Sequence, residues 1–291
     1  MGASYVRCRL AQWLSLCLGP RLAFACAERL ADAQWRCAPE VRAAVQANLS
    51  AIHGAPVRAD AALVREVFRN FGRYLVEFLT IHRVPSPAVQ VEGADELRAL
   101  SRGGRGLILL AAHVGNWEVG AIVLRRMGFP VTVVALPHRD PRLDRLFNAQ
   151  RRRCGVEVIP LGRHAARWSL QRLREGHLLG ILGDREFGHN GVGLSLCGAQ
   201  VTLPRGPAVL SLRSQAPIVP TFLIREGPWR FRLRMEPPLW PAAQTIHDGS
   251  VQAMTRAYAV VLERYLKQFP DQWLMFQPVM AVSPLKVKGE R

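Results

Sequence analysis

His113 and Glu118 are the residues of this sequence whose types and spacing best suit chemistry. A carboxylate that holds one nitrogen of an imidazole fixes its tautomer, and the other nitrogen is then free to take a proton from a hydroxyl group. Residues five positions apart on one helix point to different faces, so this pair can meet only across a turn. We therefore expect His113 to be a general base that Glu118 orients, provided that the chain turns between them.

The surrounding sequence predicts such a turn. The apolar run 106–112 is short, continuous and bounded by glycines, which is typical of a strand buried on both faces. A helical segment follows at 117–128, with Asn116 as its predicted N-cap. Open α/β sheets bind ligands at the carboxyl edge of their strands, so we expect His113 and Asn116 to face substrate there. The alternative is purely structural: a histidine packed at a strand end, followed by an ordinary acid in the first helical turn.

A second group of charged residues follows the apolar segment 177–183. These are Asp184, Arg185 and Glu186, and in a parallel sheet they lie at the same edge as His113. A triplet of this kind, flanked by glycines, could bind a metal, hold a substrate or form a solvated loop.

A basic cluster between residues 139 and 153 is the third candidate. Several arginines share one face of the predicted helix 141–154 and could hold phosphate groups through paired hydrogen bonds. Arg139, Arg151 and Arg152 are the arginines that we expect to contact substrate. The same pattern is also typical of a solvated helix face.

HVGNWE, residues 113–118, resembles the H-x4-D/E motif of the lysophospholipid acyltransferase superfamily. GDREFG, residues 183–188, and the small-residue segment after it are similar to the branch of lipid A lauroyl/myristoyl and phosphatidylinositol-mannoside acyltransferases. The resemblance covers nearly the whole chain. It implies an enzyme that moves a fatty acyl chain from an acyl-carrier-protein or coenzyme A thioester to a hydroxyl of a lipid or glycolipid, with no metal or bound cofactor.

The resemblance also assigns the charged triplet. It implies that Glu186 steadies His113 from the other side or contacts the acceptor, that Arg185 lies in the substrate site, and that Asp184 is structural. Gln277 and Pro278 stand where the branch carries basic residues, which weakens the case for lipid A as the acceptor.

The charge of the chain requires an anionic partner. The net charge is +17, so acidic lipid headgroups, an acidic acyl carrier and nucleic acid are all possible partners. A basic nucleic-acid-binding protein is the alternative function, but it leaves both motifs unused and shows no known binding module. We therefore expect no nucleic-acid partner. The six cysteines lack metal-ligand spacing, which favours buried or free thiols in a reducing compartment.

The N-terminus contains apolar residues interleaved with arginines. The uncharged stretch 10–20 is about half of the ~20 residues that a membrane-spanning helix needs. Trp13, Leu14, Leu18 and Phe24 fit helices that lie on an anionic membrane, and equally fit a helix packed on the core. We expect a peripheral protein on the cytoplasmic face of the cytoplasmic membrane.

The pattern as a whole predicts an α/β fold with a mostly parallel central sheet flanked by helices. We expect an N-terminal helical segment for membrane association and packing, 1–88, followed by an α/β domain, 89–291, to which the resemblance assigns the acyltransferase activity. The expected helices are 39–53, 58–80, 117–128, 141–154, 164–175, 205–215 and 250–269. The expected strands are 106–112, 131–136, 156–161, 177–183, 218–225 and 230–235, with a hairpin or extended loop at 191–202.

Overall fold

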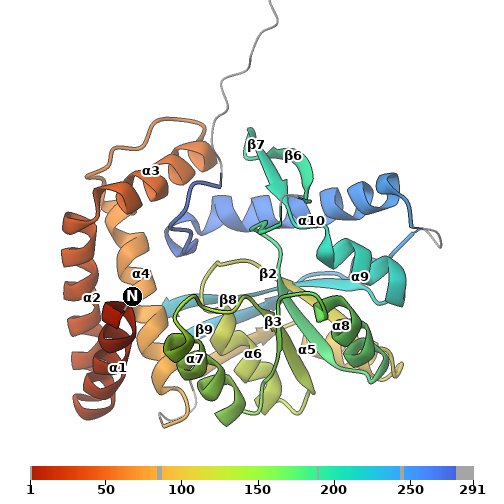
Figure 1. Ribbon diagram of the computed structural model, residues 1–291, viewed down its shortest axis with the longest axis horizontal. Helices are drawn as coiled ribbons and strands as arrows, with labels where there is room; N and C mark the ends of the chain where they lie inside the picture. Colours follow the sequence, from red (N-terminus) through yellow and green to blue (C-terminus); the bar gives the residue numbers. More distant parts are fainter. Residues whose placement is uncertain (1, 84–86, 189, 243–245, 280–291) are drawn as a thin grey trace, which may run out of the picture.

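A seven-stranded sheet with helices on both faces forms the centre of the protein (Figure 1). The computed structural model describes residues 2–83, 87–188, 190–242 and 246–279. The strand order is β1-β9-β8-β2-β5-β3-β4, and neighbouring strands are parallel except for the antiparallel pair β8 and β9. This confirms the predicted α/β class and the mostly parallel sheet.

The elements follow the predicted order closely. The strands of the sheet are β1 Ala88–Glu92, β2 Leu107–Ala111, β3 Val131–Ala135, β4 Glu157–Pro160, β5 Leu178–Leu182, β8 Ile218–Gly227 and β9 Arg230–Met235. A separate antiparallel hairpin consists of β6 Val192–Leu196 and β7 Ala199–Leu203. The helices are α1 Gly2–Cys17, α2 Gly19–Cys37, α3 Pro39–His53, α4 Ala62–Thr80, α5 Ala94–Ser101, α6 Trp117–Arg126, α7 Pro141–Arg153, α8 Ala165–Arg174, α9 Gly206–Ser214 and α10 Asp248–Gln268, with a short 3-10 turn, η1, at Pro270–Gln272.

Strand β2 shows how the sheet divides the core. Ile108 and Leu110 pack with residues of α8, α9 and α10, whereas Leu107 and Leu109 pack with residues of α4 to α7. Side chains of a strand alternate between its faces, so a continuous apolar strand buries both. The prediction of a strand buried on both faces is therefore confirmed.

The N-terminal helices form a layer at one end of the sheet, at the left of Figure 1. Helix α4 carries the predicted apolar stripe, with Val64, Val67 and Phe68 fully or nearly fully buried. It begins at Ala62 rather than at Arg58, because residues 58–61 form a turn. Residues of α2 and α3 complete this cluster, so α4 lies between the outer helices and the sheet.

Helices α1 and α2 expose several large apolar side chains. Trp13, Leu22 and Leu30 are 61%, 57% and 61% exposed. Phe24, which fitted either a membrane surface or the protein core, is buried against Trp229, whereas the side chain of Leu14 lies outside the described residues. Within the described ranges, none of the helices is both long and apolar enough to cross a bilayer.

The segment after α10 returns to the carboxyl edge of the sheet. The backbone N–H of Leu274 donates to the carbonyl of His113 at 2.7 Å, and Trp273 forms an isolated antiparallel bridge with Val114. Residues 272–275 therefore lie directly beside the turn between β2 and α6.

Candidate active site

The turn between β2 and α6 places His113 at the carboxyl edge of the sheet. Gly115 has a φ of 68°, and an added Cβ would lie 2.0 Å from the carbonyl oxygen of Leu223, so only glycine fits there. Asn116 caps α6 as predicted, because its side-chain oxygen accepts from the backbone N–H of Val119 at 3.2 Å. The turn is thus closely packed against β8.

Asp184 is the carboxylate that contacts the His113 ring. Its Oδ1 lies 2.9 Å from Nδ1 of His113, and its Oδ2 accepts from the backbone N–H of the same residue at 2.9 Å. The indole N–H of Trp273 donates to Oδ2 at 2.8 Å. An ionised carboxylate can only accept, so Nδ1 carries the proton and Nε2 of the neutral ring has a free lone pair.

Asp184 is ionised although it is only 1% exposed. Burial alone would raise the pKa of its carboxyl group, but the His113 ring, the Trp273 indole and a backbone N–H together hold this pKa below its ordinary value. The site therefore contains a fixed negative charge behind the histidine.

Glu118 occupies a different position from the one expected. It lies in the first turn of α6, but its side chain forms a buried two-bond ion pair with Arg151 of α7, including a 2.9 Å bond from Nε to Oε2. The interaction with Glu118 raises the pKa of the Arg151 guanidinium although burial opposes this. The partner of His113 is instead Asp184, which was expected to be structural. Asp184 reaches His113 because β5 pairs with β2 and ends at the same edge of the sheet.

Two other expected substrate contacts are also buried. Asn116 is 0% exposed and donates to Glu77 of α4 at 2.7 Å, so its side chain is fully used within the protein. Arg151 is buried and paired with Glu118, although both side chains line the cavity that His113 lines. Arg152, next to it, is exposed.

Arg139 and Arg185, both expected to contact substrate, lie at the same cavity as His113. The volume of this cavity is about 490 Å³. Among the described residues, no carboxylate forms an ion pair with either arginine, and the Arg185 guanidinium lies over the ring of Phe187, 4.6 Å from its centroid. Burial lowers the pKa of Arg185, and the nearby Asp184 opposes this shift. Glu186 lies in an adjoining cavity of about 500 Å³, which shares Arg185.

The interior of the His113 cavity is apolar. It extends from the carboxyl edge between the sheet and α6, past residues contributed by β2, β3 and β5. Its small or aliphatic lining residues include Leu109, Ala121, Leu124, Val131, Val133 and Gly180. A cavity with these walls suits a hydrocarbon chain, with cations and the histidine at its polar end.

No group of three or more His, Cys, Asp or Glu side chains within the described ranges has the arrangement of a metal site. None of the six cysteines, all within the described ranges, forms a disulfide.

The fold and the site together define a class of α/β proteins in which a buried carboxylate holds a histidine beside an apolar cavity. The chain belongs to the bacterial lipid A biosynthesis acyltransferase family, whose model matches residues 9–280. It is 28% identical to a phosphatidylinositol mannoside acyltransferase of Mycolicibacterium smegmatis over 79% of this chain and 77% of that protein. It is 24% identical to the lipid A biosynthesis palmitoleoyltransferase of Escherichia coli over 77% and 72% of the two chains. The family resemblance and the enzyme class inferred from the sequence are thereby confirmed.

Proposed function

We propose that this acyltransferase moves a fatty acyl chain from an acyl-carrier-protein or coenzyme A thioester to a hydroxyl of a glycolipid. The observation that carries the proposal is the His113–Asp184 pair at the polar end of an apolar cavity. The pair supplies a base for a hydroxyl, and the cavity supplies a site for an acyl chain.

The reaction follows from the geometry of the pair. Nε2 of His113 removes the proton of the acceptor hydroxyl, and the oxygen attacks the thioester carbonyl. When the tetrahedral intermediate collapses, the carbon–sulfur bond breaks and the protonated imidazole returns its proton to the thiolate. Asp184 fixes the tautomer of His113 and stabilises the imidazolium that forms between these steps.

Arg185 and Arg139 are our candidates for binding the charged parts of the substrates. Both donors named above carry phosphate near their thioester arm, and arginine binds phosphate through paired hydrogen bonds. Arg185 follows Asp184 directly and lines both cavities, so it also suits stabilisation of the oxyanion.

A glycolipid acceptor is favoured by the relatives. The names of two relatives specify a phosphatidylinositol mannoside and lipid A. This chain is 28% identical to the first relative and 24% identical to the second. Glu186, in the polar cavity next to Arg185, is our candidate contact to the acceptor headgroup.

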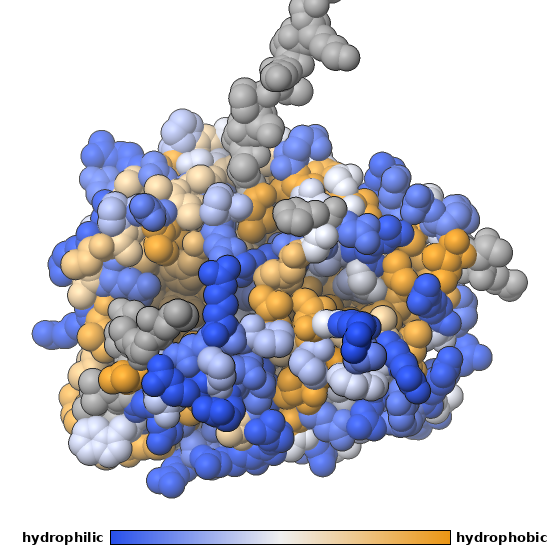
Figure 2. Space-filling model, in the orientation of Figure 1, coloured by the Kyte–Doolittle hydropathy of each residue, from blue (hydrophilic) through white to orange (hydrophobic). Residues whose placement is uncertain are grey.

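The exposed apolar residues of α1 and α2 support peripheral binding to the cytoplasmic face of the cytoplasmic membrane. Trp13, Leu22 and Leu30 would insert between headgroups, while the net charge of +17 draws the protein to an anionic surface. Figure 2 shows apolar and hydrophilic residues intermixed over the face that it presents.

The test is acyl transfer by purified protein, with carrier-protein and coenzyme A thioesters offered in parallel and with mannosylated phosphatidylinositol or a lipid A precursor as acceptor. His113→Ala should lower the rate by roughly 10²- to 10⁴-fold, the usual size of general base catalysis. Its thermal unfolding should match that of the wild type. Near-normal transfer by a folded His113→Ala variant would contradict the mechanism.

A further inference from the structure

We propose that Glu77, on α4, is a positioning residue for acyl transfer, which acts through Asn116 to hold the turn that carries His113. The proposal rests on the catalytic role of His113 given above. It assigns the N-terminal helical layer a function in catalysis that is separate from membrane binding.

Glu77 contacts the turn between β2 and α6, which carries His113, directly. Its side chain is 0% exposed, and its Oε2 accepts from Nδ2 of Asn116 at 2.7 Å. The side-chain oxygen of Asn116 accepts from the backbone N–H of Val119. The backbone N–H of Asn116 donates to the carbonyl of Leu223 at 2.9 Å. Asn116 is thus held from α4, α6 and β8 at once, three positions after His113.

Arg225, on β8, fixes Glu77 in turn. Its Nε and Nη2 donate to the two carboxylate oxygens of Glu77 at 2.8 and 2.6 Å, and its Nη1 donates to Asn70 at 3.1 Å. Gln272 pairs with the backbone N–H and carbonyl of Arg225 through its side chain, and its own carbonyl accepts from Gly115 at 3.0 Å. Two routes therefore lead from Arg225 to the same turn.

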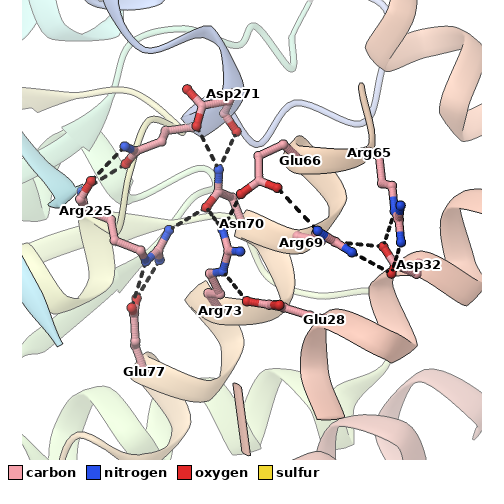
Figure 3. Close-up of polar contacts among 11 residues, drawn as sticks. Glu28, Asp32, Arg65, Glu66, Arg69, Asn70, Arg73, Glu77, Arg225 and Asp271 are labelled. Carbon is pink, nitrogen blue, oxygen red and sulfur yellow. Dashed lines mark hydrogen bonds and ion pairs between the residues drawn. The ribbon is translucent and has the colours of Figure 1, made fainter. Parts of the chain in front are cut away.

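The network continues outward to the second helix. Figure 3 shows Arg73 between Asn70 and Glu28, a residue of α2, and the bonds measure 2.9 and 2.8 Å. Asp32, also on α2, is paired with Arg65 and Arg69 at the right of the same view. Arg69 also forms an ion pair with Glu66, which pairs with Arg73, so Asp32 lies at the far end of the same network. It is separated from the turn by several contacts and offers a control for a remote change.

A buried ion pair is an inefficient way to stabilise a fold, because apolar residues of similar volume often stabilise equally well or better. It does fix geometry, since a bidentate arginine–carboxylate pair permits one arrangement. The placement of this pair against the capping residue of α6 therefore points to control of the position of His113.

The experiment uses the full chain and compares three variants, of which the two double variants are called Leu/Met and Gln/Met below. Glu77→Leu/Arg225→Met removes both charges and the acceptor for Asn116. Glu77→Gln/Arg225→Met also removes the charges but keeps an acceptor oxygen at position 77. Asn116→Ser keeps a cap for α6, but its shorter side chain cannot reach Glu77. This variant therefore removes the bond between positions 116 and 77 while the Glu77–Arg225 ion pair stays intact.

We expect kcat to fall roughly 10- to 100-fold in the Leu/Met and Asn116→Ser variants, because small misplacements of a catalytic group have effects of that size. KM for the thioester should change less than about threefold, since the acyl cavity is unaltered. The Gln/Met variant should recover most of kcat. In proton NMR, the downfield signal of the His113 Nδ1–H, assigned by its absence in His113→Ala, should shift or broaden in the two impaired variants.

Asp32→Asn should lower the melting temperature and leave kcat and the NMR signal unchanged. The proposal is overturned if Leu/Met or Asn116→Ser keeps the wild-type kcat and signal, or if Asp32→Asn lowers kcat equally. If the wild type itself transfers no acyl group, the proposed function fails, whereas the NMR comparison still decides whether Glu77 positions His113.

Discussion

Trp273 donates its indole N–H to the same Asp184 oxygen that accepts from the backbone of His113. The two bonds hold Oδ2, so that Oδ1 is left for the His113 ring. The orientation of the carboxylate is therefore set by a residue from the end of the described chain, and the tautomer of the histidine depends on it.

Asp184→Asn should lower kcat by roughly 10²- to 10⁴-fold, because an amide can present its NH2 group to Nδ1 and stabilise the wrong tautomer. Trp273→Phe keeps an aromatic ring and removes one bond to Asp184, so its loss should be smaller. Steady-state kinetics with a saturating thioester measures both. Equal kcat in Asp184→Asn and the wild type would exclude Asp184 from the mechanism.

Glu118→Gln should mainly lower stability. The substitution leaves the Arg151 guanidinium buried without its counter-charge, which typically costs about 3–5 kcal/mol. Glu118→Leu/Arg151→Met removes both charges and should recover most of the lost stability. Urea unfolding would measure this, and an unchanged midpoint for Glu118→Gln would refute a structural role for the pair.

The Asp32 cluster predicts a pH dependence of stability. Hydrogen bonds from Arg65 and Arg69 lower the pKa of Asp32 far below its ordinary value of 3.8. A carboxyl group with a depressed folded-state pKa stabilises the fold above its unfolded pKa, and this stabilisation is lost as the pH falls. The melting temperature of Asp32→Asn should therefore lie below that of the wild type at pH 7, and the gap should narrow below about pH 4. A gap independent of pH would contradict this assignment.

Trp13→Ser/Leu22→Ser should weaken binding to anionic vesicles, most clearly at high salt. Salt screens the arginine contribution but not the apolar one, so wild-type protein should resist release where the variant does not. Val260→Ser, at an exposed apolar position on α10, is the matched control and should bind as the wild type does. Complete release of wild-type protein by salt would show that binding is only electrostatic.

Ala121→Leu should shift the substrate preference of the enzyme toward thioesters with shorter acyl chains. Ala121 lines the apolar part of the cavity, so a larger side chain leaves less room there. One methylene group too many in a filled pocket alters kcat/KM by roughly 10-fold or more. Competition between thioesters of different lengths gives the ratio directly. If the chain-length profile is unchanged, the acyl chain lies elsewhere.

The sequence was sufficient for the features that depend on local pattern. The strand before His113, the cap at Asn116 and the stripe of α4 follow from apolar periodicity and capping chemistry, and all three are present. The carboxylate beside His113 was misassigned, because Glu118 is near in sequence whereas Asp184 becomes a neighbour only through the pairing of β2 with β5.

The same limit explains the other residues that were missed. Glu77, Arg225 and Trp273 reach the turn from three distant elements, and no local pattern predicts their meeting. A usable signal for Asp184 did exist, since it follows an apolar strand and therefore lies at the carboxyl edge of a parallel sheet. For Phe24 the sequence left two environments open, because amphipathic spacing does not distinguish a membrane from a protein core as the apolar partner.

The late position of Trp273 in the chain has a consequence for biosynthesis. The ribosome delivers α1 and α2 first, and His113 and Asp184 leave it well before the indole that orients their contact. A chain that ends at Gln268 should accordingly lose more activity than Trp273→Phe, because it also lacks the backbone of residues 272–275 beside the turn. The active site can therefore take its final geometry only after the last described segment has left the ribosome.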